Sequence, residues 1–254
     1  MRTRSRIFQR TRAIADRGPA LGRRLHSLAW LHVLGPDDLN DLTVASYNQA
    51  TGFETPEHNL NGLWDWEERA FARLFGGATR VIVAGAGGGR EMIALAKMGL
   101  DVFGFDASSD LVAACGEHLR GANVSAQCVF AAPGEVPAGP ASFDALVIGR
   151  GVYHHIPGSA RRVAFLAECA ARVASGSPMF LGDFLTRPDR RSLNDVALKR
   201  SIERGDSISA SFFHHFTNAE IVAELGRAGF AVDEVRDTPH PGSAMAHALA
   251  HKRA

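Results

Sequence analysis

The stretch VIVAGAGGGRE, residues 81–91, decides the fold of this 254-residue chain. Its four leading apolar residues predict a short buried strand, the glycines predict a turn, and a helix is expected over residues 91–98. Glycine can adopt positive φ and lets the backbone approach a ligand closely. The first turn of the following helix presents free N–H groups to a polar or anionic group. The stretch therefore predicts a strand–turn–helix unit with a binding site at the turn.

Asp106 follows the next expected strand, residues 101–105, and is a second feature of a nucleoside site. A carboxylate at this place can accept hydrogen bonds from both hydroxyls of a ribose. Two kinds of cofactor carry such a ribose, a dinucleotide and S-adenosylmethionine. The dinucleotide fingerprint needs glycine or alanine at its sixth position, which is Arg90 when counted from Gly85. The bulk of Arg90 opposes close helix–strand packing there, so the pattern favours S-adenosylmethionine.

Strand and helix patterns alternate through the middle of the chain. Beyond those already named, strands are expected at residues 126–131, 143–149 and 179–184, and helices at 108–120 and 160–174. Alternation of this kind requires crossover connections between strands. It therefore predicts a parallel sheet that helices cover on both faces.

The C-terminal region has a different pattern. Thr217 and Glu220 form a capping box that opens a helix over residues 219–228. Strands are expected at residues 230–235 and 244–249, joined by a short turn at 239–242, and so short a connection makes them antiparallel. The predicted fold is α/β: a Rossmann-like, seven-stranded, mostly parallel sheet with a C-terminal antiparallel hairpin and an N-terminal helical cap.

Residues 1–70 are expected to form that helical cap or lid, and residues 71–254 the Rossmann-like domain. Helices are predicted at residues 21–34, 37–49 and 63–75, with a loop at 51–62. The first 24 residues hold eight arginines and one acid, Asp16. This composition indicates a poorly ordered end that leads into a surface helix. A basic arm for an anionic partner and a transit peptide remain alternatives.

The composition excludes several classes of protein. The net charge of +1 gives no electrostatic argument for nucleic acid or an anionic membrane. No apolar run reaches about 18 residues, so no membrane span is expected. Cys115, Cys128 and Cys169 are far apart in the sequence, which indicates reduced thiols, a cytoplasmic location and no metal site.

Together these motifs resemble the class I, Rossmann-like family of S-adenosylmethionine-dependent methyltransferases over roughly residues 64–252. Gly85, Gly87 and Gly89 match the family's G-x-G-x-G motif, and Asp106 matches the acid that holds the ribose. FDALV (143–147) and GRGVYHHIP (149–157) match the fourth strand and the loop after it. The resemblance implies that the cofactor contacts Gly85, Ala86, Gly87, Gly89, Asp106, Ala107, Ala132, Gly149 and Arg150.

One position departs from the family. Members often have an acid after the third strand that binds the adenine amino group, and Ala132 stands there in this chain. Backbone groups and packing are therefore expected to hold the adenine. Glu135 either compensates for the missing acid or is a solvated loop residue.

The resemblance implies methyl transfer to a small molecule, at oxygen or nitrogen rather than carbon. The cofactor supplies the leaving group, so the protein aligns the reactants and removes a proton where the acceptor requires it. Histidine can serve as that base near neutral pH, since its ordinary pKa is ~6.5. The candidates are His154 and His155 after the fourth strand, and His214 after an expected lid over residues 185–213. Each of the three is equally compatible with a structural role.

Four aromatic residues are expected to shape the acceptor pocket: Tyr47, Trp64, Trp66 and Tyr153. Aromatic rings can also shield a sulfonium ion. Two other functions stay open, an RNA-directed methyltransferase and a catalytically silent module that binds S-adenosylmethionine. No basic stripe follows the N-terminal arginines. The Asn-Pro-Pro-aromatic motif common in nucleic-acid-methylating enzymes is replaced by residues 149–152, GRGV.

Overall fold

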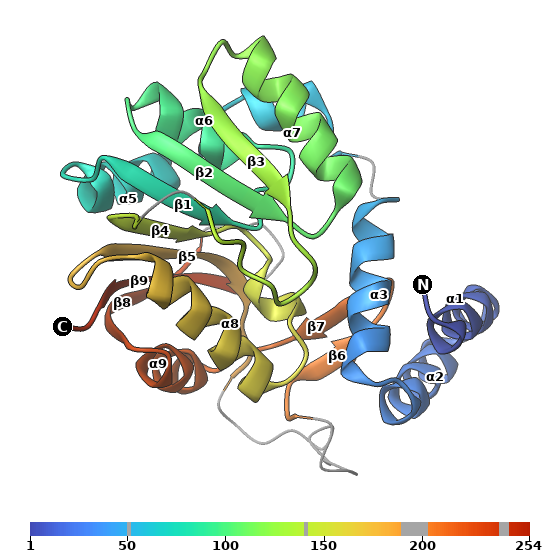
Figure 1. Ribbon diagram of the computed structural model, residues 1–254. Coiled ribbons are helices and arrows are strands. Elements are labelled where there is room, and N and C mark those ends of the chain that lie inside the picture. Colours follow the sequence, from blue (N-terminus) through green and yellow to red (C-terminus); the bar gives the residue numbers. More distant parts are fainter. Residues whose placement is uncertain (50–51, 140–141, 189–202, 239–243) are drawn as a thin grey trace.

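A twisted β-sheet forms the centre of the molecule (Figure 1). The computed structural model describes residues 1–49, 52–139, 142–188, 203–238 and 244–254. Within these residues the sheet has seven strands in the order β3-β2-β1-β4-β5-β9-β8. The strands are β1 (Arg80–Ala84), β2 (Asp101–Asp106), β3 (Ala126–Phe130), β4 (Ala145–Ile148), β5 (Pro178–Leu185), β8 (Phe230–Asp237) and β9 (Met245–Lys252).

The pairing of these strands confirms the predicted fold class. The first five are parallel to one another, whereas β9 lies antiparallel to both β5 and β8. The capping box before the last helix is also confirmed, because Thr217 Oγ1 accepts a hydrogen bond from Glu220 N at 3.2 Å. The predicted turn at residues 239–242 lies outside the described residues, as do residues 189–202 of the predicted lid.

Helices cover both faces of the sheet, as the alternating pattern predicted. One face carries α5 (Asp65–Phe75), α6 (Arg90–Lys97) and α7 (Ser109–Gly121), and the other carries α8 (Ser159–Arg172) and α9 (Asn218–Arg227). Successive residues of β1 point to opposite faces: Val81 and Val83 belong to one buried cluster, Ile82 and Ala84 to the other. A strand buried on both faces has this continuous apolar sequence.

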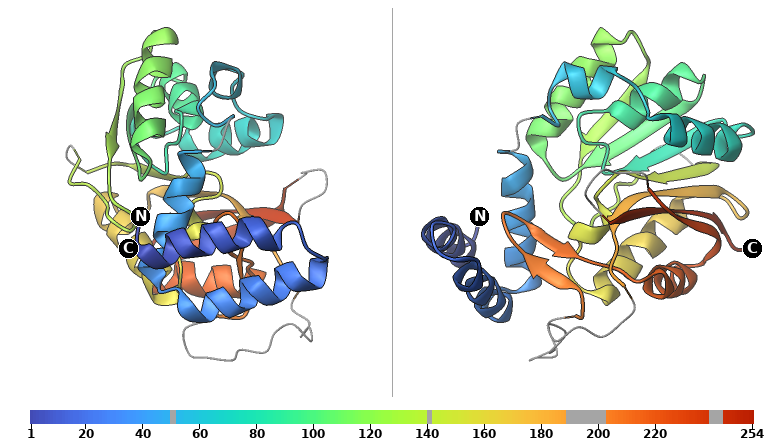
Figure 2. Two further views of the ribbon diagram at one scale, coloured as in Figure 1. Left: turned by 90° about the vertical axis from the view of Figure 1, so that its right-hand side faces the viewer. Right: turned by 180° about the vertical axis from the view of Figure 1, so that it is seen from behind.

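The N-terminal helices form a separate layer. They are α1 (Thr3–Ala15), α2 (Ala20–Val33) and α3 (Pro36–Tyr47), followed by the short α4 (Pro56–Leu60) inside the predicted loop. The first three pack beside a two-stranded sheet made by β6 (Asp206–Ile208) and β7 (Phe212–His214), as Figure 2 shows. Their shared buried cluster, here called the small core, consists of Phe8, Leu31, Leu34, Leu39, Leu42, Ile208 and Phe212.

The prediction of a poorly ordered N-terminus was wrong, because residues 3–15 are helical. Phe8 is fully buried and packs against the rings of His26 and Trp30, while Ser5 Oγ donates a hydrogen bond to the Asp38 carbonyl at 3.1 Å. These contacts explain why an arginine-rich segment is ordered. No helix of the described residues is long and apolar enough to cross a bilayer.

Candidate active site

The glycine turn connects β1 to α6 at the carboxyl end of the sheet. Gly85 N and Ala86 N both donate to the carbonyl of Phe105, at 2.8 and 3.0 Å, which ties the turn to β2. Gly85 has φ +74°, and a Cβ atom there would lie 2.0 Å from Val152 Cγ2. Only glycine fits this position. The turn therefore leaves its backbone exposed to any ligand that lies across it.

Asp106 lies over the same turn. Its Oδ2 accepts a hydrogen bond from Gly87 N and its Oδ1 accepts one from Ser108 N, both at 2.8 Å. Burial raises the pKa of this carboxyl, and the two backbone N–H groups oppose that shift. A carboxylate oxygen has two lone pairs, so each oxygen retains capacity to accept a ligand hydroxyl. This arrangement fits the predicted ribose contact.

A single cavity of about 780 Å³ extends from the glycine turn to β7. This volume lies in the range of small-molecule sites. Seven of the predicted cofactor-contacting residues line it: Gly85, Ala86, Gly87, Asp106, Ala107, Ala132 and Arg150. Gly89 and Gly149 are not on its wall. Gly89 packs against Cys115 below α6, and Gly149 lies directly behind the Gly85 carbonyl.

The side chain of Arg90 is buried beside the cavity rather than excluded from the fold. It forms two hydrogen bonds with Glu67, at 2.6 and 2.8 Å, and one with Glu91 at 2.7 Å. One cation thus faces two carboxylates, and burial raises the pKa of Glu67 although Arg90 opposes the shift. The bulk of Arg90 is accommodated because these acids pair with it.

The structure does not bring Trp64 or Trp66 to the cavity wall. The guanidinium groups of Arg90 and Arg150, which do line the cavity, lie 4.4 and 4.5 Å from the centre of the Trp64 ring. Trp66 stacks on Trp64 and on His247. The two tryptophans therefore support the wall from behind.

Tyr47, at the end of α3, does line the cavity. Its ring lies edge-on to His155 with a centroid separation of 5.3 Å. Its hydroxyl and His154 Nε2 both border Gly151. Burial raises the pKa of Tyr47, and the charge of Asp106 adds to the shift. Tyr47 thus lies between the glycine turn and the histidines.

His154 and His155 line the cavity side by side, 4.4 Å apart between ring centroids. They belong to the 3-10 turn η1 (Tyr153–His155), which follows β4 as the sequence predicted. Leu185 N donates to His154 Nδ1 at 3.3 Å, and His155 Nδ1 lies 2.5 Å from the Phe212 carbonyl. Burial lowers the pKa of His154 well below its ordinary value and that of His155 to about 4. Both rings are therefore neutral at pH 7.

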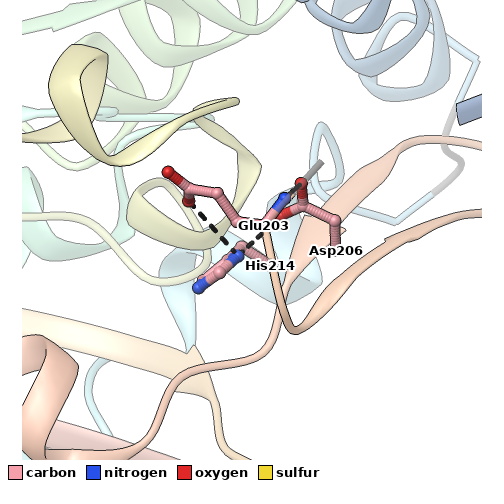
Figure 3. Close-up of side chains that lie close together, drawn as sticks. All are labelled: Glu203, Asp206 and His214. Atoms are coloured by element: carbon pink, nitrogen blue, oxygen red, sulfur yellow. Dashed lines mark hydrogen bonds and ion pairs between the residues drawn. The ribbon is translucent and has the colours of Figure 1, made fainter. Parts of the chain in front are cut away.

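His214 lies away from the cavity wall. Its Nδ1 is 2.7 Å from Asp206 Oδ1 and 3.9 Å from Glu203 Oε2 (Figure 3). Histidine and carboxylates can ligate a metal, but both acids already have protein partners. Arg162 binds Glu203 at 2.7 Å, and Glu203 N donates to Asp206 Oδ2 at 2.8 Å. The group is an ion-pair network that joins α8 to the β6–β7 hairpin.

Tyr153 also points away from the cavity. Its hydroxyl donates to Glu224 Oε2 at 2.5 Å, and its ring stacks on Phe216. Arg162 binds the same Glu224. Tyr153 is thus part of the packing between η1, α8 and α9.

Sequence reasoning named none of the individual residues that close the far end of the cavity, although Leu185, Ser211 and Phe213 lie within the predicted lid. The residues at this end are Thr43 and Val44 on α3, Leu185 at the end of β5, Ser211 and Phe213 of the β6–β7 hairpin, and Met245 on β9. These positions are far apart in the sequence. The aromatic pair Phe212–Phe213 was the one local signal that could have indicated them.

Comparisons with known proteins agree with this architecture. Residues 81–176 match the family model described as a methyltransferase domain. No curated protein matches the chain in sequence.

Solved structures with the same fold are numerous. A methyltransferase from Methanosarcina mazei is 19% identical, with TM-score 0.62 over 76% of this chain and 99% of that one. The 1,6-didemethyltoxoflavin N1-methyltransferase of Burkholderia thailandensis, solved with 1,6-didemethyltoxoflavin and S-adenosylhomocysteine, is 18% identical, with TM-score 0.64 over 87% and 92%. The magnesium protoporphyrin IX methyltransferase of Synechocystis PCC 6803, solved with S-adenosylmethionine, is 17% identical, with TM-score 0.58 over 85% and 97%.

Proposed function

We propose that this chain, which carries a methyltransferase domain with the class I fold, transfers the methyl group of S-adenosylmethionine to an oxygen or nitrogen of a small molecule. One observation carries the proposal. A single cavity joins the glycine turn and Asp106, which suit a nucleoside, to a pair of neutral histidines. A donor at one end and an acceptor at the other would meet inside it.

The residues around the glycine turn would hold the donor. Asp106 would accept the ribose hydroxyls, and the backbone of residues 85–87 would contact the amino-acid portion. The loop of residues 131–135 would hold the adenine, with Ala132 in place of an acid and Glu135 on the same wall. When bound, S-adenosylmethionine supplies an activated methyl group together with its own leaving group.

The far end of the cavity would hold the acceptor. Its wall comes from α3, η1, the end of β5 and the β6–β7 hairpin, and it combines aromatic and aliphatic side chains with polar ones such as Thr43, Ser46 and Ser211. This lining suits a small organic molecule, as in the toxoflavin and protoporphyrin methyltransferases named above. On this basis we assign acceptor binding jointly to the N-terminal cap and the β6–β7 hairpin.

His155 is the proposed base. A backbone carbonyl only accepts hydrogen bonds, so the proton of the neutral ring lies on Nδ1, which donates to Phe212. The lone pair on His155 Nε2 is then available for a proton from the acceptor. In His154 the lone pair on Nδ1 already accepts from Leu185 N, so this ring is less suited to the role. The rings of Tyr47 and Phe213 flank His155 and would hold its imidazole in place.

Calorimetric titration of the purified protein with S-adenosylmethionine, S-adenosylhomocysteine and NAD tests the donor. We expect binding of the first two and none of NAD, and the reverse result would refute the proposal. Formation of S-adenosylhomocysteine is then followed with a panel of small hydroxyl and amino compounds and with RNA. Turnover with RNA alone would identify an RNA-directed enzyme. Cofactor binding without turnover on any acceptor would identify a silent module.

A further inference from the structure

The two adjacent histidines present opposite hydrogen-bonding groups to the cavity. A backbone N–H only donates, so the contact with Leu185 N requires a lone pair on His154 Nδ1 and places that ring's proton on Nε2. The Phe212 carbonyl only accepts, so His155 carries its proton on Nδ1 and a lone pair on Nε2. No hydrogen bond within the described residues engages Nε2 of either ring. A donor and an acceptor thus stand next to each other on one wall.

Two aromatic rings flank this pair, and the polar side chains of Thr43 and Ser211 line the same end of the cavity. The Phe213 ring lies 4.8 Å from His155 and 5.6 Å from His154, between ring centroids. Tyr47 closes the other side of His155 at 5.3 Å. Aromatic side chains pack best against planar rings, by stacking or edge-to-face contact. The acceptor subsite is therefore shaped for a planar ring system.

Charge also restricts the acceptor. Among the described residues, the acids that line the cavity are Glu91, Asp106, Glu135 and Glu168. They come from the start of α6, the end of β2, the loop after β3, and α8 opposite that loop. None comes from α3, η1, β5 or the β6–β7 hairpin, which surround the two histidines. A buried ammonium group needs a paired carboxylate, so this end does not favour a cationic amine.

We propose that the acceptor is an uncharged or anionic aromatic compound in which the O–H or N–H to be methylated lies next to a second oxygen or nitrogen that accepts a hydrogen bond. His155 Nε2 accepts the O–H or N–H proton, and His154 Nε2–H donates to the neighbouring atom. Catechols, aromatic 2-hydroxy ketones and cyclic amides of heteroaromatic rings have this pattern. The inference rests on the proposed function and specifies its substrate class.

Methyl transfer to an acceptor bound in this way is a balanced step. The acceptor oxygen or nitrogen forms a bond to the methyl carbon with its own electron pair. The carbon–sulfur bond breaks and its electrons remain on sulfur, which leaves as a neutral thioether. The acceptor proton passes to His155 Nε2. The low pKa of His155 suits an acceptor whose own O–H or N–H is acidic, as in phenols and cyclic amides, rather than an aliphatic alcohol.

Matched isomers test the inference on the full chain saturated with S-adenosylhomocysteine. Calorimetry compares catechol with hydroquinone, and 2-hydroxyacetophenone with 4-hydroxyacetophenone. These pairs have the same size and composition, and only the adjacent isomers can engage both histidines. We expect the adjacent isomer of each pair to bind about tenfold more tightly. Equal affinities, including no binding of either isomer, would overturn the inference.

Three variants assign the effect to the histidines. His154→Leu removes the donor and should abolish the preference for adjacent isomers. His155→Gln keeps an acceptor without a basic nitrogen, so binding should persist while methyl transfer falls. His251→Gln, at an exposed site on β9, is the matched control. It should change neither the preference for adjacent isomers nor the rate of methyl transfer. Retention of the isomer preference in His154→Leu would contradict the assignment.

The tautomers can be observed directly. Long-range ¹H–¹⁵N correlation spectra of the protein should give the Nε2–H pattern for His154 and the Nδ1–H pattern for His155. The same pattern for both rings would overturn the inference. Failure of the protein to bind S-adenosylhomocysteine would instead refute the proposed function. The two failures are therefore distinguishable.

Discussion

The buried group of Arg90, Glu67 and Glu91 allows a sharp prediction about stability. The Arg90 and Glu67 side chains are 5% and 2% exposed, and Arg90 is the cation for both acids. Arg90→Met leaves two buried carboxylates without their counter-charge, which should cost about 4 kcal/mol. Glu67→Gln leaves Arg90 paired with Glu91, but the amide nitrogen cannot accept from Arg90, so one of the two hydrogen bonds is lost and the other is weakened, which should cost about 2 kcal/mol. Arg90→Met should cost more than Glu67→Gln, because it leaves two charges unpaired whereas Glu67→Gln leaves none.

The pH dependence has a definite sign. Burial already raises the pKa of Glu67, and Arg90→Met removes the cation that opposes this shift. The folded state of the variant then binds more protons than the unfolded state, so its stability falls as pH rises through the pKa of Glu67. The difference in unfolding free energy between wild type and Arg90→Met should therefore widen from pH 5 to pH 8.

Urea denaturation of the protein without cofactor measures these differences, and thermal unfolding should show decreases of roughly 10 °C and 5 °C. Arg80→Met is the matched control, because Arg80 pairs with Asp101 at 2.8 Å on the surface, with side chains 40% and 63% exposed. Its cost should stay below about 1 kcal/mol. The reasoning would be refuted if Glu67→Gln lost more unfolding free energy than Arg90→Met. It would also be refuted if the difference between wild type and Arg90→Met narrowed as pH rises.

Three further predictions concern the site. Gly85→Ala should abolish cofactor binding in a calorimetric titration, because its Cβ would clash with Val152. Gly85→Ala/Val152→Ala should restore part of the affinity, since the 2.0 Å contact with Val152 Cγ2 is removed while the strain of positive φ remains. Asp106→Asn should weaken the binding of S-adenosylhomocysteine at least tenfold, because it removes an acceptor for the ribose hydroxyls. Asp101→Asn, at the exposed start of β2, is the control and should not change this affinity. Equal affinities of the two variants would contradict the ribose assignment. His155→Gln should lower kcat by a factor of about 10² to 10⁴. Because His155 must be neutral to accept a proton, kcat/KM of the wild type should fall as pH drops through about 4 and stay level above it, and a midpoint near 6.5 would contradict the burial of the ring.

The sheet was predictable because its signals are local. A run of apolar residues followed by glycines and a helix identifies β1 and its turn, and Asp106 ends β2 at the same edge of the sheet. The hairpin of β8 and β9 was predictable since a short connection excludes a crossover.

The direction of individual side chains was not predictable. Trp64 and Tyr153 are aromatic residues of the kind that line pockets, but charged side chains hold both of them behind the wall: Arg90 and Arg150 for the tryptophan, Glu224 for the tyrosine. The position of His155 at the cavity was predictable, because this residue comes shortly after β4 in the chain. Its hydrogen-bonding state depends on a carbonyl more than fifty residues away in the sequence.

For a related reason, the sequence did not reveal that the N-terminal segment forms a packed helix. The α1 sequence has no strong apolar face, and its one fully buried apolar residue, Phe8, packs on residues of α2 and near the hairpin. In α2 the apolar spacing predicted the helix correctly, yet Leu21, Leu25 and Leu28 face solvent and Leu31 makes the buried contact. Periodicity indicates a helix but does not specify which side is covered.

The small core has an evolutionary consequence. It shares no residue with the two clusters that hold the sheet together, and it supports α3 and β7, which line the end of the cavity where we propose that the acceptor binds. Substitutions within it can reshape that wall while the glycine turn and Asp106 keep their places. A lineage built on this plan can therefore diverge in the compounds it recognises while the machinery for its donor is inherited unchanged.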